Sequence, residues 1–278
     1  MKFGIHAGLW MRSWSDDLAP ILATAADIGF DGVELSLLGI GLDRAADLRR
    51  QAQALGLELT CSTGLGADAD PTSDDPAMRA RAETVLAEAI ATTQALGAAS
   101  LAGVVAAPWG VFEPARKADR AARAAETLGR LDGRLRDSGV RLGIEAINRF
   151  ETDLTNTAAE AVAIAEATCS AQIGVLLDTF HMNIEEKDPA AAIQATGDRL
   201  CHFHVSDNDR GVPGSGRYDF AASAGALRAI DYRGWVTAEM FVVPGHPTSA
   251  DLNIWRAIEA EPTEAARAAL AFMKRVFS

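Results

Sequence analysis

The chain has 278 residues, with 26 Lys or Arg against 38 Asp or Glu, so its formal net charge is −12 at pH 7. Hydrophobic residues make up 49% of the chain, a proportion typical of a globular protein. The net charge is negative and the Lys and Arg residues do not cluster in the sequence, which argues against a protein that binds nucleic acid by neutralising phosphates.

The amino terminus and the cysteines indicate the compartment. Residues 1–14 lack the cleavage site of a signal peptide, and no run reaches the roughly 18 to 20 uncharged apolar residues that span a bilayer. Cys61, Cys169 and Cys201 lie far apart, which fits reduced thiols rather than a disulfide framework or a zinc cluster. We therefore expect a cytoplasmic protein without a membrane partner.

An Ala-rich amphipathic helix, a glycine and a short run of aliphatic residues recur along the chain. Helices are predicted at 16–28, 43–55, 75–97, 115–138 and 263–277. Strands are predicted at 2–6, 32–37, 57–61, 100–105, 141–146, 173–178, 200–205 and 235–240.

This alternation predicts parallel strands joined by right-handed crossovers. Strand-helix units that cover the whole chain predict an α/β fold, a closed (β/α)8 TIM barrel, with residues 1–278 as a single catalytic domain. An open doubly wound sheet is the alternative. It is disfavoured because no G-x-G-x-x-G follows the first strand and no P-loop occurs.

Ionisable residues occur in the second-half strands, where strands buried on both faces should be almost entirely apolar. Glu145, Asp178, His204 and Glu239 stand near the carboxyl ends of four consecutive predicted strands, where barrel active sites lie. Each of them taken alone is equally well explained as a buried polar residue whose hydrogen bonds are satisfied. Four of them in matched positions favour a functional site. Two Glu, one Asp and one His suit one divalent cation of the Mn²⁺, Mg²⁺ or Co²⁺ kind.

Three more polar residues follow the same strands. Glu151 comes after the fifth predicted strand, His181 after the sixth and Arg210 after the seventh. Each by itself is typical of a solvated loop. Together they lie at the face of the barrel where substrate contacts are expected.

Other side chains are weaker candidates. Trp14 and Trp109 are placed to form an apolar wall against a substrate, with ordinary packing as an equal alternative, and His6 is placed to contact the distal part of that substrate. His202 is interpreted as a buried structural histidine. Glu34 is interpreted as a hydrogen-bond partner of a metal ligand or of the substrate, or as half of a simple salt bridge.

At this point the motifs support a resemblance. Residues 145–151, 177–186 and 202–204, with Arg210 six residues after His204, resemble the D-tagatose 3-epimerase and D-psicose (D-allulose) 3-epimerase family of ketose 3-epimerases. These are xylose-isomerase-like TIM barrels. The similarity runs from the first strand to the last helix.

The resemblance implies that the four strand-end residues bind one divalent ion per chain, with Mn²⁺ expected first and Mg²⁺ or Co²⁺ as alternatives. It implies that Glu145 and Glu239 are also the catalytic pair, and that Glu151, His181 and Arg210 bind the C1 to C3 end of the sugar. Because family members often associate, we expect a homodimer or homotetramer.

Inverting C3 of a ketose requires removing the proton beside the C2 carbonyl and returning one to the opposite face. Two carboxylates flanking the substrate, with a cation that stabilises the cis-enediolate, are sufficient for this. We therefore expect a metal-dependent isomerase, a ketose 3-epimerase, whose substrate is a free ketohexose or ketopentose of the D-tagatose, D-fructose/D-allulose or L-ribulose type.

Four departures from the family pattern bear on substrate preference. His6 stands where the family has Phe or Tyr, residues 207–210 replace Glu-Ser-Asn-Arg, residues 218–220 replace the Pro-Trp after the glycine-rich loop, and residues 239–241 replace Glu-Pro-Phe. We expect the chemistry to survive these changes.

Other functions are compatible with a metal site on this barrel. An aldose–ketose isomerase moves the proton between C1 and C2, and it is the first alternative. A metal-dependent hydrolase of abasic DNA normally gathers more ligands, and the net charge of −12 would repel its substrate. A sugar-binding protein that keeps a metal only for structure is the third alternative.

Overall fold

The eight strands form a closed parallel barrel. The structure, a computed structural model, describes residues 1–278. Its strands are β1 (Lys2–His6), β2 (Gly32–Ser36), β3 (Glu58–Leu65), β4 (Ser100–Pro108), β5 (Arg141–Ala146), β6 (Ile173–Asp178), β7 (Leu200–Val205) and β8 (Trp235–Ala238). Each strand pairs with the next, and β8 pairs with β1 through Ile5 and Ala238, which closes the sheet. The predicted TIM barrel is therefore confirmed, and the open-sheet alternative is wrong.

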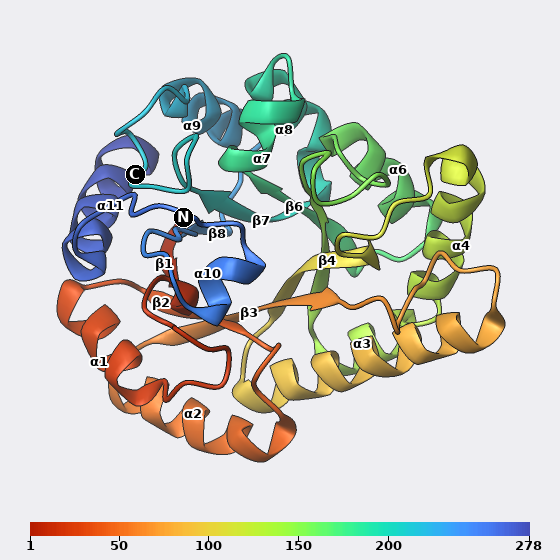
Figure 1. Ribbon diagram of the computed structural model, residues 1–278, viewed down its shortest axis with the longest axis horizontal. Coiled ribbons are helices and arrows are strands. Elements are labelled where there is room, and N and C mark those ends of the chain that lie inside the picture. The colour runs from red at the N-terminus through yellow and green to blue at the C-terminus, as the bar shows by residue number, and fades with distance from the viewer.

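Most helices surround the barrel as an outer ring, while α10 lies over its middle (Figure 1). The helices are α1 (Ala19–Ile28), α2 (Leu42–Ala54), α3 (Pro76–Leu96), α4 (Lys117–Gly129), α5 (Asp132–Ser138), α6 (Ala158–Ala167), α7 (Thr179–Glu185), α8 (Pro189–Thr196), α9 (Phe220–Ala229), α10 (Pro247–Asp251) and α11 (Pro262–Phe277). Short 3₁₀ turns are η1 (Ala7–Leu9), η2 (Pro114–Arg116) and η3 (Gly197–Arg199). None of the helices is both long and apolar enough to cross a membrane.

The ends of α3 illustrate why the sequence predicts helix boundaries well here. Asp75 accepts a hydrogen bond from the backbone N–H of Ala77 at 2.8 Å, and Pro76 fills the first turn, where its missing N–H has no cost. Gly97 ends the helix in the left-handed region with φ 76°, which glycine adopts without a steric penalty.

Some predicted boundaries are wrong. The eighth strand ends at Ala238 rather than at residue 240, and the third extends to Leu65 rather than 61. The predicted helix 115–138 is two helices, α4 and α5, and α4 ends at Gly129, where a Cβ would lie 3.0 Å from the backbone oxygen of Thr168. The first helix begins at Ala19 rather than at residue 16. The carboxylate of Asp16 instead accepts hydrogen bonds from the backbone N–H groups of Arg12 and Ser13, which stabilises a turn before the helix.

Candidate active site

A cavity of about 350 Å³ opens at the carboxyl ends of the strands. It is lined by all the predicted substrate-binding residues and by both predicted catalytic glutamates: His6, Trp14, Trp109, Glu145, Glu151, His181, Arg210 and Glu239. Residues of α10 and the loop after it, Asp251 and Leu252, also line it, and Figure 1 shows α10 over the middle of the barrel. A second cavity of about 340 Å³ at the opposite end contains none of these residues.

The structure brings the four predicted metal ligands together. Glu145 lies on β5, Asp178 ends β6, His204 lies on β7 beside Asp178 in register, and Glu239 directly follows β8. One ligand atom from each lies within 4.8 Å of the others, and all four side chains are buried. Asp178 and His204 are covered almost completely, so they lie behind the cavity surface rather than on it.

The donor set fits a divalent cation. Three carboxylates and one imidazole are ligands that Mn²⁺, Mg²⁺ or Co²⁺ accept. The Nδ1 atom of His204 is buried without a hydrogen-bond partner, and it lies 3.5 Å from Oε1 of Glu239. A buried nitrogen without a hydrogen-bond partner, grouped with three carboxylates, is the arrangement expected of a metal ligand.

The pKa values of the two glutamates of this group shift in opposite directions. Burial, together with the negative charge of Glu239, raises the pKa of Glu145 well above its ordinary value. Burial alone would raise the pKa of Glu239 as well, but the positive charges of His204 and Arg210 lower it below its ordinary value. Two carboxylates whose pKa values shift in opposite directions are typical of an acid and base pair.

Arg210 crosses the edge of this group in a constrained conformation. Its backbone has φ 68°, in the left-handed region that non-glycine residues rarely occupy. Its Nη1 atom donates to Glu239 at 2.8 Å and also contacts Asp178. Burial would lower the pKa of Arg210, but Asp178 and Glu239 raise it, so the guanidinium remains charged. A fixed fork of donors therefore faces the cavity.

His181 is neutral and its proton can be assigned. Burial and the charge of Arg210 lower the pKa of His181 well below its ordinary value. Its Nδ1 atom accepts a hydrogen bond from the backbone N–H of Asn148 at 3.1 Å, so the proton of the neutral ring is on Nε2. Nη2 of Arg210 lies 3.1 Å from this Nε2, and with this tautomer the contact joins two donors rather than a donor and an acceptor. Both groups line the cavity, where they are available to an acceptor.

Glu151 is held at the rim by two donors. The indole Nε1 of Trp109 donates to its Oε2 at 3.0 Å, and Nδ2 of Asn148 donates to its Oε1 at 2.8 Å. Asn148 thus contacts both His181 and Glu151, a role that we did not predict. Its position in the polar run directly after β5 was the available signal.

The remaining predicted residues lie on the other side of the cavity. Trp14 donates from its indole Nε1 to Asp251 at 2.9 Å, so it holds α10 over the opening. His6 is only 2% exposed, and its Nε2 atom lies 3.0 Å from Oγ of Ser62. Burial lowers the pKa of His6.

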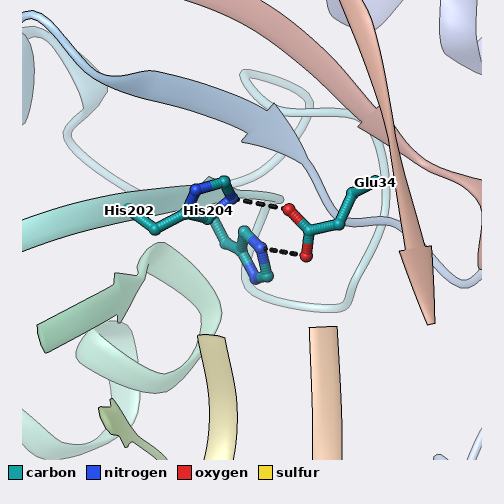
Figure 2. Close-up of side chains that lie close together, drawn as sticks. All are labelled: Glu34, His202 and His204. Atoms are coloured by element: carbon teal, nitrogen blue, oxygen red, sulfur yellow. Dashed lines mark hydrogen bonds and ion pairs between the residues drawn. The ribbon is translucent and has the colours of Figure 1, made fainter. Parts of the chain in front are cut away.

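Glu34 and the two histidines of β7 form a second buried group (Figure 2). The carboxylate of Glu34 faces the Nε2 atoms of His202 at 2.6 Å and of His204 at 2.9 Å. Burial opposes ionisation of Glu34, but the two histidines lower its pKa well below the ordinary value. The geometry bears out contact of Glu34 with a predicted metal ligand, and the same contacts are ion pairs, so the salt-bridge interpretation holds as well. Glu34 does not line the cavity where a substrate would lie.

Comparisons with known proteins agree with this geometry. The family model described as a xylose isomerase-like TIM barrel matches residues 22–276. The chain is 35% identical to a D-psicose 3-epimerase of Agrobacterium fabrum, over 99% of both chains. It is 35% identical to an L-ribulose 3-epimerase of Mesorhizobium japonicum, over 98% of this chain and 93% of that one.

A solved structure of a D-psicose 3-epimerase in the presence of D-fructose superposes with a TM-score of 0.94 at 34% identity, covering 100% of this chain and 99% of that one. These comparisons confirm the resemblance indicated by the motifs.

Proposed function

Since the chain belongs to the ketose 3-epimerases of the xylose isomerase-like TIM-barrel family, and so is a carbohydrate isomerase, we propose that it inverts C3 of a free ketose in a metal-dependent reaction. The observation that carries this proposal is the buried group of Glu145, Asp178, His204 and Glu239 at the floor of the cavity. It joins two carboxylates suited to proton transfer with a complete set of ligands for one cation.

Glu145 and Glu239 are the proton-transfer pair in this proposal. Glu145 lies on β5, Glu239 directly follows β8, and both line the cavity. The carboxylate form of one removes the C3 proton, and the carboxylic acid form of the other returns a proton to the opposite face. Burial and the charge of Glu239 raise the pKa of Glu145, whereas His204 and Arg210 lower that of Glu239, and this difference between the two carboxylates supports distinct roles for them.

His181 and Arg210 orient the reacting carbonyl. The N–H of His181 and the guanidinium of Arg210 are both donors and both line the cavity, so a substrate oxygen that approaches the pair from the cavity can accept from both. Donors aimed at the oxygen that gains negative charge lower the barrier to proton removal. Glu151, held by Trp109, accepts from a hydroxyl at the same end of the sugar in this scheme.

We propose that Glu145, Asp178, His204 and Glu239 hold one Mn²⁺ ion per chain, with Mg²⁺ or Co²⁺ as alternatives, and that residues 1–278 act as a single catalytic domain. When bound, the ion supplies a Lewis acid next to the C2 carbonyl. We further propose that the protein is cytoplasmic and forms a homodimer or homotetramer. Light scattering after gel filtration would measure the mass of the oligomer.

The test of the reaction is a panel of free ketohexoses and ketopentoses incubated in D₂O with the Mn²⁺-loaded protein. Chromatography should show a C3 epimer of at least one ketose, and NMR should locate deuterium at C3. Deuterium at C1 would instead indicate an aldose–ketose isomerase. Tight ketose binding without any conversion would indicate a sugar-binding protein.

A further inference from the structure

Glu34 lies inside the barrel and reaches across it. The residue is on β2 and is 1% exposed, whereas the two histidines it contacts are on β7. Its Oε1 atom lies 2.9 Å from Nε2 of His204, and its Oε2 atom lies 2.6 Å from Nε2 of His202. Figure 2 shows both rings facing the one carboxylate, so a single acidic side chain holds both histidines.

The polar partners of Glu34 determine where the protons of the rings must be. The buried carboxylate of Glu34 is surrounded by two imidazole nitrogens and one hydroxyl, all of which can donate to its oxygens. The hydroxyl of Thr60 donates to Oε2 at 3.0 Å. An unprotonated Nε2 of His204 would place a lone pair against a carboxylate oxygen in a fully buried position, which is strongly unfavourable. The Nε2 atom of His204 must therefore carry a proton.

This assignment decides which atom of His204 is left for a ligand. When the ring gives up its second proton to bind an ion, Nε2 keeps its proton because Glu34 holds it, and the lone pair is on Nδ1. Nδ1 is the atom that lies among the carboxylates and has no hydrogen-bond partner. Free rotation of the ring is also removed, because turning it would break the bond to Glu34.

We infer that Glu34 is a positioning residue for the cation site: its carboxylate holds His204 in the tautomer and orientation that present Nδ1 to the ion. The inference rests on the proposed function, because it needs His204 to be a ligand. A carboxylate in this position also makes the imidazole a more basic ligand for the metal, and removing such a carboxylate typically weakens metal binding by about 10- to 100-fold. Glu34 touches no substrate-facing surface, since the cavity is lined by other residues.

The experiment compares Mn²⁺ affinity in three proteins. Glu34→Gln keeps the volume and removes the charge, so we expect its dissociation constant for Mn²⁺, measured from the EPR signal of the free ion, to rise about 10- to 100-fold. Thr60→Val is the matched control. It removes the other partner of the same carboxylate and leaves the Glu34–His204 bond intact, so its affinity should stay within about threefold of wild type.

A purely structural role makes a different prediction. In that case both variants lower the melting temperature, and neither changes Mn²⁺ affinity in the folded protein. Equal affinity of Glu34→Gln and wild type would overturn the inference. If Glu34→Gln does not fold, Glu34→Asp carries the test, because it keeps the charge but shortens the reach by one methylene, and unchanged affinity again overturns the inference. Wild type that binds no stoichiometric Mn²⁺ would instead overturn the proposed metal dependence itself.

Discussion

The guanidinium carbon of Arg210 lies 4.1 Å from the centre of the Phe180 ring, and the same guanidinium donates to Glu239. Stacking fixes the plane of the cation, and the ion pair fixes its direction. This double restraint accompanies a backbone in the left-handed region, which is strained for arginine. Because strain of this kind concentrates at functional sites, the orientation of Arg210 is the feature that we expect to be least tolerant of change.

Replacing Arg210 with lysine tests that orientation. Arg210→Lys keeps the charge but loses the planar fork and the stack on Phe180, so we expect kcat on the preferred ketose to fall about 10²-fold. Steady-state kinetics would measure this. Arg233→Lys, at a strongly exposed arginine paired only with Asp231, is the control and should remain at wild-type activity. Full activity in Arg210→Lys would remove this arginine from the mechanism.

Replacing each of the two glutamates should block proton transfer at a different face of the substrate. Glu145→Gln and Glu239→Gln should each reduce epimerisation by about 10²- to 10⁴-fold, the usual contribution of an acid–base group. Where Mn²⁺ remains bound, each variant should still exchange the C3 hydrogen of one epimer with D₂O, and the two variants should act on opposite epimers. Exchange of the same epimer by both would contradict the assignment of one glutamate to each face. Glu166→Gln, on the exposed side of α6, is the control.

His6 should influence substrate choice rather than chemistry. Its Nδ1 atom accepts from the backbone N–H of Gly8, and its lowered pKa keeps it neutral, so Nε2–H donates to Ser62. The hydroxyl proton of Ser62 is then free to point into the cavity. We expect His6→Phe and Ser62→Ala to shift the ratio of kcat/KM between two ketoses by about tenfold, in the same direction and without a change in Mn²⁺ affinity.

The cysteines should differ in reactivity. Burial raises the pKa of Cys61 to about 12 and that of Cys201 to about 11, so both thiols are protonated at pH 8. Cys169 is exposed. A chromogenic disulfide reagent at pH 8 should therefore modify one thiol quickly in the folded protein and all of them after denaturation. Cys201 lines the second cavity, so its rapid modification in the folded state would contradict the protection expected from its raised pKa.

The sequence was sufficient to predict the barrel and the group at its floor. Strands were recognisable because glycine follows most of the early helices, and the polar residues stood out because buried parallel strands tolerate charge only in a site. Glu145 and His204 were predictable for that reason. Neighbouring parallel strands in a barrel end at the same face, so positions near strand ends imply proximity.

What the sequence did not reveal depends on contacts across the barrel or on local backbone geometry. Pairing of Glu34 with both His202 and His204 joins strands that are not neighbours, and no spacing in the chain encodes it. The left-handed backbone of Arg210 is equally hidden, because only the surrounding loop enforces it. Gly129 was a sequence signal for the break between α4 and α5. The continuous amphipathic pattern nevertheless led us to predict a single helix there.

The most direct test of the account is a crystal of the Mn²⁺-loaded protein with diffraction data collected at the manganese absorption edge. We expect one anomalous peak per chain, in contact with Glu145, Asp178, Glu239 and the Nδ1 atom of His204. A map without a peak among these four side chains, or with its peak elsewhere on the molecule, would contradict the account.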